Sequence, residues 1–161
     1  MPRPLTKTMI GTGLGFFIGW LVVFFINLAS KPVAGGVVAG RLAPCPATQN
    51  CVSSQADDPA QAVEPFKLAG DPAATRAKLM SALAHLGGTT VVKEETNYLH
   101  AVAVTPLFRF RDDLELLIDP TNGVVHIRSA SRLGVSDLGA NRKRVERLRE
   151  LFADTPPQKE R

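Results

Sequence analysis

The sequence lacks the short motifs that would directly assign it an enzymatic reaction. It contains no Gly-x-Ser-x-Gly nucleophile motif and no glycine-rich phosphate-binding loop. Its three histidines, His85, His100 and His126, are scattered, and none has metal-ligand spacing to another histidine, a cysteine or an aspartate. We therefore assign no catalytic residue, no metal site and no cofactor. Enzymatic activity stays an open question, with a non-catalytic role favoured.

Cysteine is equally scarce, since only Cys45 and Cys51 are present. Five residues separate them, which excludes a thioredoxin-like Cys-x-x-Cys motif. A metal site would need further ligands from elsewhere in the chain. A structural disulfide that closes a short loop fits best and would persist in an oxidising compartment. The alternative is a pair of unrelated buried thiols.

Charged residues are absent between Met9 and Leu28. A helix over these 20 residues, rising about 1.5 Å per residue, would cover the roughly 30 Å hydrocarbon core of a bilayer. A cleaved signal peptide is the alternative, but its apolar region is usually only about 7–15 residues long and is followed by a small-x-small cleavage site. We therefore expect an uncleaved single-pass anchor over residues 9–28, in contact with the lipid bilayer.

The basic residues around this run set its expected orientation and partners. Arg3 and Lys7 precede it and Lys31 follows it, which favours a cytoplasmic segment 1–8 and a periplasmic C-terminal domain at the inner membrane. Within the run, three glycines recur every four residues and share one helix face, a pattern typical of helix dimerisation. Glycine is also simply common in membrane helices. A homo-oligomer or a membrane-protein partner is thus expected through Gly11, Gly15 and Gly19.

The rest of the chain predicts one domain. Residues 29–44 are rich in glycine, alanine and proline and are interpreted as a linker, followed by a globular domain over 45–153 and a polar, disordered tail over 154–161. Within the domain, residues 45–66 are dense in turn formers and predict an irregular arm. Strands are predicted at 89–95, 98–105, 114–118 and 124–128, between a helix capped by Asp71 and a helix over 138–152 capped by Asp137 or Ser136.

The order of these elements predicts an α+β fold. We expect a small antiparallel sheet of three to four strands with two helices packed on one face, preceded by one N-terminal transmembrane helix.

With these motifs together, the chain resembles the uncharacterised bacterial and plastid family called domain of unknown function 1499. The resemblance implies an envelope or membrane-associated protein and carries no activity with it. The chain departs from the family pattern at Val102, where an acidic residue is usual, at Gln49, where proline is typical, and at Arg111, where an apolar residue is typical. The matching segments are Cys45-Pro46, 50–55 (NCVSSQ), 98–100 (YLH), 108–110 (FRF), 112–115 (DDLE), 128–132 (RSASR), 137–139 (DLG) and 141–146 (NRKRVE).

Residues 128–149 contain seven basic and two acidic residues, so the rest of the chain, whose total net charge is +4, is nearly neutral. Hydroxyl residues, glycines and arginines before a helix are the groups that bind an anion at a helix N-terminus. The candidate ligand-binding residues are Ser129, Ser131, Arg132, Asp112, Asn141 and Arg142. The structural alternative, which we favour, has Arg132 paired with a carboxylate such as Asp112 or Asp58.

The neighbouring acidic strand has a similar structural interpretation, because residues 113 and 115 of a strand share a face while residue 112 points away. Asp113 and Glu115 are therefore expected to line the polar face and to pair with Arg128. Nucleic acid is excluded as a partner because no aromatic residues are interleaved with the basic ones.

We therefore expect a non-catalytic partner- or anion-binding module of the bacterial envelope. One alternative is a hydrolase-like or lipid-modifying enzyme with a site between the acidic strand and the Arg132 loop. Another is a structural subunit of a membrane complex.

Overall fold

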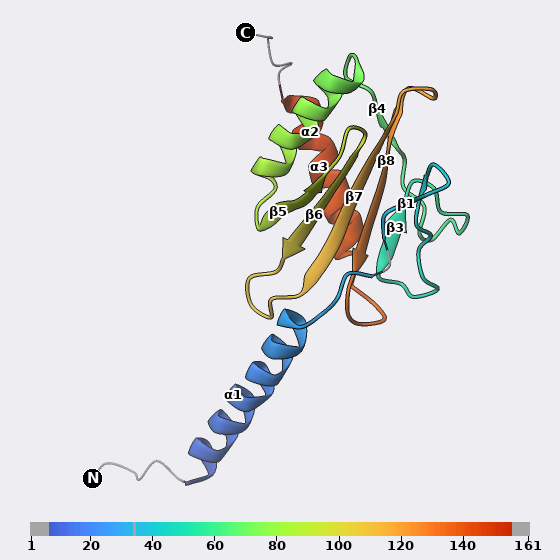
Figure 1. Cartoon of the computed structure of the whole chain (residues 1–161). Coiled ribbons are helices and arrows are strands. Elements are labelled where there is room, and N and C mark those ends of the chain that lie inside the picture. Colours follow the sequence, from blue (N-terminus) through green and yellow to red (C-terminus); the bar gives the residue numbers. More distant parts are fainter. Residues whose placement is uncertain (1–6, 34, 156–161) are drawn as a thin grey trace.

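The computed structural model describes the backbone of residues 7–33 and 35–155, with side chains from residue 15 onward except Phe16. A mixed helix and strand domain follows a long N-terminal helix that projects from one end of it (Figure 1). The helices are α1 (Lys7–Leu28), α2 (Pro72–His85) and α3 (Ala140–Asp154). The strands are β1 (Val37–Val38), β2 (Arg41–Leu42), β3 (Cys51–Ser53), β4 (Phe66–Lys67), β5 (Thr89–Glu94), β6 (Tyr98–Val104), β7 (Arg111–Asp119) and β8 (Val124–Ser131).

Six of these strands form one antiparallel sheet. Its order is β3-β8-β7-β6-β5, and β4 also pairs with β8. The α+β class is confirmed, but the expected three to four strands are too few. The missing strands, β3 and β4, are only three and two residues long and lie in the arm that we predicted to be irregular. They are strands only because distant β8 supplies their hydrogen-bond partners, for example Val52 opposite Ser129.

Helices α2 and α3 cover one face of this sheet, as expected (Figure 1). Asp71 accepts a hydrogen bond from the Ala74 backbone N–H at 2.7 Å and so caps α2, with Pro72 at its first turn. The core lies between the helices and the alternate residues of β6, β7 and β8 that point towards them. Its fully buried members include Leu79, Leu83, Leu99, Leu114, Leu116, Ile127, Val145 and Leu148.

Helix α1 requires a correction to the predicted fold. Over the part of the chain that the structure describes, no helix combines the length and apolar character needed to cross a bilayer. This finding overturns the transmembrane helix predicted over 9–28. The C-terminal half of α1 makes contacts that its apolar pattern does not reveal: Trp20 Nε1 donates to the Leu107 carbonyl at 3.1 Å, and the Asn27 side chain is only 1% exposed.

The expected self-association through the glycines of α1 is not tested by the structure and stays a prediction. Among the described residues, no other part of the chain comes within 4 Å of a β-carbon placed at Gly15 or Gly19. The surroundings of Gly11 lie outside the described residues.

The residues interpreted as a linker lie against the sheet. We call residues 29–33 and 35–44 the strap. Its strands β1 and β2 pair with each other, and β2 contacts β7 and β8 on the face opposite the helices. A β-carbon at Gly35 would lie 2.7 Å from a Glu115 carboxylate oxygen, so only glycine allows the strap to approach this closely. The strap therefore forms a partial third layer.

The predicted disulfide between Cys45 and Cys51 is confirmed, with a Cα–Cα distance of 5.7 Å. It joins the end of the strap to the start of β3. Closing so short a loop contributes roughly 2 kcal/mol in the chain-entropy model. The predicted disordered tail lies largely outside the described residues, because the description ends at residue 155.

Candidate functional site

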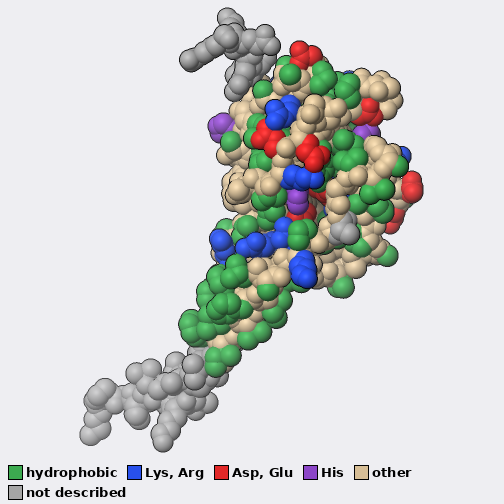
Figure 2. All heavy atoms as spheres, viewed as in Figure 1, with side chains coloured by type: hydrophobic (Ala, Val, Ile, Leu, Met, Phe, Trp, Pro, Cys, Tyr) green, Lys and Arg blue, Asp and Glu red, His purple; other side chains and the backbone are tan. Residues whose placement is uncertain are grey.

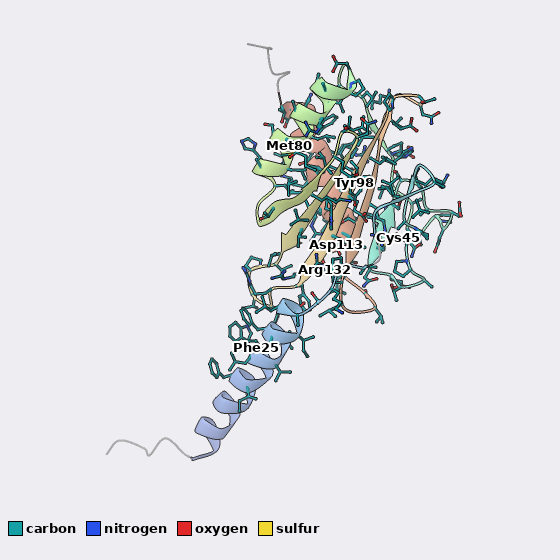
Figure 3. The ribbon with its side chains drawn as sticks, viewed as in Figure 1. Phe25, Cys45, Met80, Tyr98, Asp113 and Arg132 are labelled. Atoms are coloured by element: carbon teal, nitrogen blue, oxygen red, sulfur yellow. A yellow bond between two sulfur atoms is a disulfide. The ribbon has the colours of Figure 1, made fainter. Side chains whose placement is uncertain are left out.

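Strand β7 sends its carboxylates to both faces of the sheet, as the alternation of strand side chains requires. Asp113 and Glu115 lie on the face covered by the strap, and Asp112 lies on the face covered by the helices. Figure 3 shows Asp113 beside Arg132 at the end of the sheet near α1, with Tyr98 of β6 further from α1 along the sheet. All three carboxylates are buried, with exposed fractions of 2% or less.

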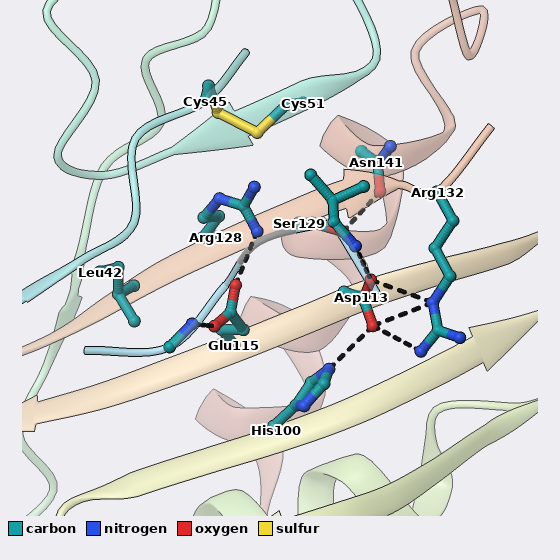
Figure 4. Close-up of polar contacts among 12 residues, drawn as sticks. Leu42, Cys45, Cys51, His100, Asp113, Glu115, Arg128, Ser129, Arg132 and Asn141 are labelled. Atoms are coloured by element: carbon teal, nitrogen blue, oxygen red, sulfur yellow. Dashed lines mark hydrogen bonds and ion pairs between the residues drawn. A yellow bond between two sulfur atoms is a disulfide. The ribbon is translucent and has the colours of Figure 1, made fainter. Parts of the chain in front are cut away.

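Glu115 is the centre of a buried cluster under the strap. It accepts hydrogen bonds from Arg128 Nη1 at 2.6 Å, from the Tyr98 hydroxyl at 2.6 Å and from the Gly36 backbone N–H. The predicted pairing with Arg128 is thus confirmed for Glu115 (Figure 4). Burial and the adjacent Glu115 carboxylate raise the pKa of Tyr98 far above its usual value, so this phenol remains protonated and donates.

Asp113 organises a second cluster on the same face. It accepts from His100 Nε2 at 2.8 Å and from Arg132 Nε and Nη2 at 3.0 and 2.8 Å, a bidentate arrangement (Figure 4). The Val33 backbone N–H of the strap also donates to it at 3.2 Å. Arg132 is therefore paired with a carboxylate as we favoured, but the carboxylate is Asp113 rather than Asp112 or Asp58.

The surroundings of Asp113 determine its ionisation. Burial alone would raise its pKa, but the hydrogen bonds from His100 and Arg132 outweigh burial and hold the pKa below its usual value. Because the unfolded pKa is about 3.9, this carboxylate stabilises the folded state at pH values above that. The stabilisation is lost as the pH falls through the lower folded pKa.

We expect the Asp113→Asn variant to lose less stability than the wild type between about pH 5 and pH 2, because its folded state no longer depends on an ionised residue 113. Urea unfolding at a series of pH values, followed by circular dichroism, measures this. The Glu150→Gln variant, at a carboxylate whose side chain is 62% exposed, is the control and should keep the wild-type pH dependence. An Asp113→Asn variant with the wild-type pH dependence would contradict the assignment.

The helix-facing side holds a separate polar network. Asn141 is fully buried; its Oδ1 accepts from Ser129 and Arg144, and its Nδ2 donates to the Asn50 carbonyl and the Ser131 hydroxyl at 2.9 Å each. Arg144 continues the network to Asp112. Four of the predicted ligand-binding residues thus come together here, but their side chains bond within this network, to one another or to Arg144 and the Asn50 carbonyl. They are Asp112, Ser129, Ser131 and Asn141.

The other two predicted residues lie elsewhere. Arg132 is on the opposite face of the sheet, and Arg142 donates to the carbonyls of Ala60 and Ala62 at 2.9 Å. The hydrolase-like site predicted between the acidic strand and the Arg132 loop required Asp112, Ser131 and Arg132 to converge. The sheet separates Arg132 from the other two, so this geometry does not support such a site.

A groove opens on the strap-covered face, beside the strap and over β5, β6 and the start of β7. Its volume is ≈ 590 Å³. Three valines contribute its apolar part, and Arg132 and His100 of the Asp113 cluster reach it from one side. The lining residues are Pro32, Thr90, Val92, Lys93, His100, Val102, Val104, Arg111 and Arg132.

Two basic residues of the groove were not among the predicted site residues. Lys93 lies opposite His100 because the register of β5 shifts by one residue between Val91 and Lys93. Uninterrupted alternation would place Lys93 with Val91 on the helix-facing side, so no local sequence signal reveals it. Arg111 makes no side-chain hydrogen bond or ion pair with the part of the chain that the structure describes. The only signal in the sequence that pointed to Arg111 was that the family usually has an apolar residue at this position.

Most of the chain matches one known protein family. A family model described as "Protein of unknown function (DUF1499)" matches residues 41–152. The chain belongs to the DUF1499 family. No match was found among curated proteins or among solved structures.

The groove is lined by residues from inside and from outside the segment that matches the DUF1499 model. The lining residues from Thr90 to Arg132 lie within residues 41–152, whereas Pro32 and most of the strap precede them. Helix α1 also precedes the match. The groove of this DUF1499 protein is therefore built on the family domain and bordered by a segment outside it.

Proposed function

We propose that this DUF1499 protein is a non-catalytic module that binds an anionic ligand in the groove over β5, β6 and β7. The observation that supports this most directly is the charge of the groove. Lys93, Arg111 and Arg132 line it, and none of its described lining residues is acidic. Arg132 is neutralised by Asp113, but Arg111 has its guanidinium available for a ligand.

Lys93 adds to this positive potential. It pairs with Glu95 at 2.7 Å, but both side chains are more than half exposed. An exposed pair of this kind is worth little, roughly 0–1 kcal/mol, so an anion in the groove can compete for the lysine. Its ammonium also lies 5.6 Å from the centre of the Tyr98 ring, which keeps it near the groove.

The remaining lining indicates the ligand class. A volume of ≈ 590 Å³ lies within the roughly 300–1,000 Å³ typical of small-molecule sites. Val92, Val102 and Val104 provide apolar surface beside the basic residues. We therefore propose a ligand with one phosphate-like or carboxylate-like group and an apolar portion.

Binding of dodecyl phosphate, with inorganic phosphate in parallel, tests this proposal by NMR titration of the full chain. We expect shifts at Arg111, Lys93 and His100, and tighter binding of dodecyl phosphate because of its apolar chain. The Arg111→Glu variant should bind at least tenfold more weakly, since reversing one charge removes roughly 1.5–3 kcal/mol of charged contact, a factor of about 10–150.

Lys143→Glu is the matched control, because it makes the same charge reversal at an exposed residue of α3 on the other side of the sheet. Equal weakening by both variants would mean a general effect of net charge and would contradict binding in the groove. Shifts confined to residues outside the groove would contradict it as well.

A further inference from the structure

Two loops at one end of the domain carry most of its exposed apolar side chains. Outside α1, eight of the described large apolar residues are exposed, and five of these lie in the β6–β7 loop and the β8–α3 loop. Leu138 is 90% exposed and Val135 is 74% exposed, so these side chains are almost entirely in solvent and not partly buried at the domain surface. We call these five residues the apolar end: Leu107, Phe108, Phe110, Val135 and Leu138.

Both loops lie at the end of the sheet from which α1 projects (Figure 1). Trp20 of α1 reaches the first loop through its bond to the Leu107 carbonyl. On the second loop, the Gly134 carbonyl accepts from the Asn50 side chain at 2.7 Å. The first loop is thus fixed to α1 and the second to the segment before β3, while the apolar side chains of both loops are exposed.

Each of the two loops contains a non-glycine residue with a left-handed backbone conformation. Only three non-glycine residues in the described chain have a positive φ, and two of them, Arg109 (57°) and Leu138 (54°), lie in these loops. Left-handed backbone at such residues is costly and persists where the surrounding structure or the function requires it. One of these two residues, Leu138, is also 90% exposed.

Basic residues outnumber acidic ones around the apolar end. Residues 105–111 contain Arg109 and Arg111 and no acidic residue. The β8–α3 loop contains a single acid, Asp137, whose two carboxylate oxygens accept from Gly139 and Asn141 backbone N–H groups at the start of α3. Lys31 lies just after α1, and Figure 2 shows lysine and arginine side chains gathered where α1 meets the domain.

We propose that the apolar end docks the domain on the surface of a bilayer that contains anionic lipids. Apolar side chains projecting from separate loops fit between lipid headgroups, and adjacent arginine and lysine side chains meet the lipid phosphates. Arg142 and Arg149 of α3 are not part of this surface, because their guanidinium groups donate to carbonyls of residues 60–65. The docking surface consists of the two loops and the basic residues beside them.

A local probe distinguishes docking of these loops from any binding through the exposed apolar residues of α1. The full chain is labelled with an environment-sensitive fluorophore, without reductant, in the single-site variants Leu107→Cys and Leu138→Cys. Thr121→Cys, in the exposed β7–β8 turn at the far end of the sheet, is the matched control. Vesicles are prepared from phosphatidylcholine alone or with phosphatidylglycerol, with and without brominated acyl chains as quenchers.

We expect the labels at 107 and 138 to be quenched by brominated lipid in the phosphatidylglycerol vesicles, and the label at 121 to be unaffected. Quenching should fall in pure phosphatidylcholine and at high salt, because the headgroup attraction is screened. The Leu107→Asp/Leu138→Asp double variant should reduce quenching of a label at Val135→Cys by tenfold or more, since burial of even one leucine is worth about that factor. Val38→Asp, at an exposed apolar residue of the strap, should leave it unchanged.

Three results would overturn the proposal. The first is protein that floats with the vesicles while the labels at 107 and 138 are not quenched. The second is equal quenching in neutral and anionic vesicles. The third is a concentration-dependent blue shift of these labels without lipid, which would assign the apolar end to a second copy of the chain.

Discussion

Replacing Arg128 with methionine is expected to lower the free energy of unfolding by about 3–5 kcal/mol, the usual cost of removing one partner from a buried ion pair. Arg128 is fully buried and pairs with Glu115 at 2.6 Å. Its removal leaves the Glu115 carboxylate buried without its counter-charge. Since whole domains are stable by only about 5–15 kcal/mol, urea unfolding monitored by circular dichroism should show a large shift of the midpoint.

The double variant Glu115→Leu/Arg128→Met is the informative comparison. Buried ion pairs replaced entirely by apolar residues often cost little. Moreover, Arg128 Nε and Nη2 have no hydrogen-bond partner among the described residues, so the native pair is incompletely satisfied. We expect the double variant to be more stable than Arg128→Met. Additive losses from the two single substitutions would contradict a coupled pair.

The Asn141→Leu substitution should cost about 2–4 kcal/mol, because it leaves several buried polar groups without partners. Asn141 joins β8, α3 and the segment before β3 through Ser129, Ser131, Arg144 and the Asn50 carbonyl. Leucine has a similar volume but no polar atom. Urea unfolding gives the loss, and hydrogen exchange should show faster opening of β3 and the start of α3.

Lys143→Leu is the control for Asn141→Leu, because it introduces the same residue at an exposed position of the same helical turn. It should change the stability by less than about 0.5 kcal/mol, as surface substitutions usually do. If the two variants were equally stable, the Asn141 network would contribute nothing beyond its packing.

Sequence patterns correctly predicted the elements that depend on residues close together in the chain. Asp71 and Pro72 begin α2 as expected, the hairpin of β7 and β8 follows its turn signal, and alternation along β7 separated Asp112 from Asp113 and Glu115. Short strands β3 and β4 could not be predicted, because two or three residues carry no periodicity and only pairing with β8 makes them strands. The apolar run of α1 predicted a membrane span that the described structure does not support.

The kinds of interaction in the candidate site could be predicted from the sequence, but which residues meet there could not. The sequence indicated that Arg132 would pair with a carboxylate, but its partner Asp113 depends on the register of β7 against β8, which no residue pattern specifies. The groove depends on a shift of register near Lys93. The expected location in the bacterial envelope and self-association through the glycines of α1 stay predictions.

The strap also determines when the protein can finish folding. Its Val33 N–H bonds Asp113, 80 residues later, and its Ser30 carbonyl accepts from Arg132, 102 residues later. During synthesis, which proceeds from the N-terminus, these partners do not exist when the strap emerges. The strap is made long before β7 and β8, yet it is among the last segments to find its place, because contacts of such long sequence separation are slow to form. Until β7 and β8 are complete, the strap has no surface on which to settle and is available to chaperones and proteases.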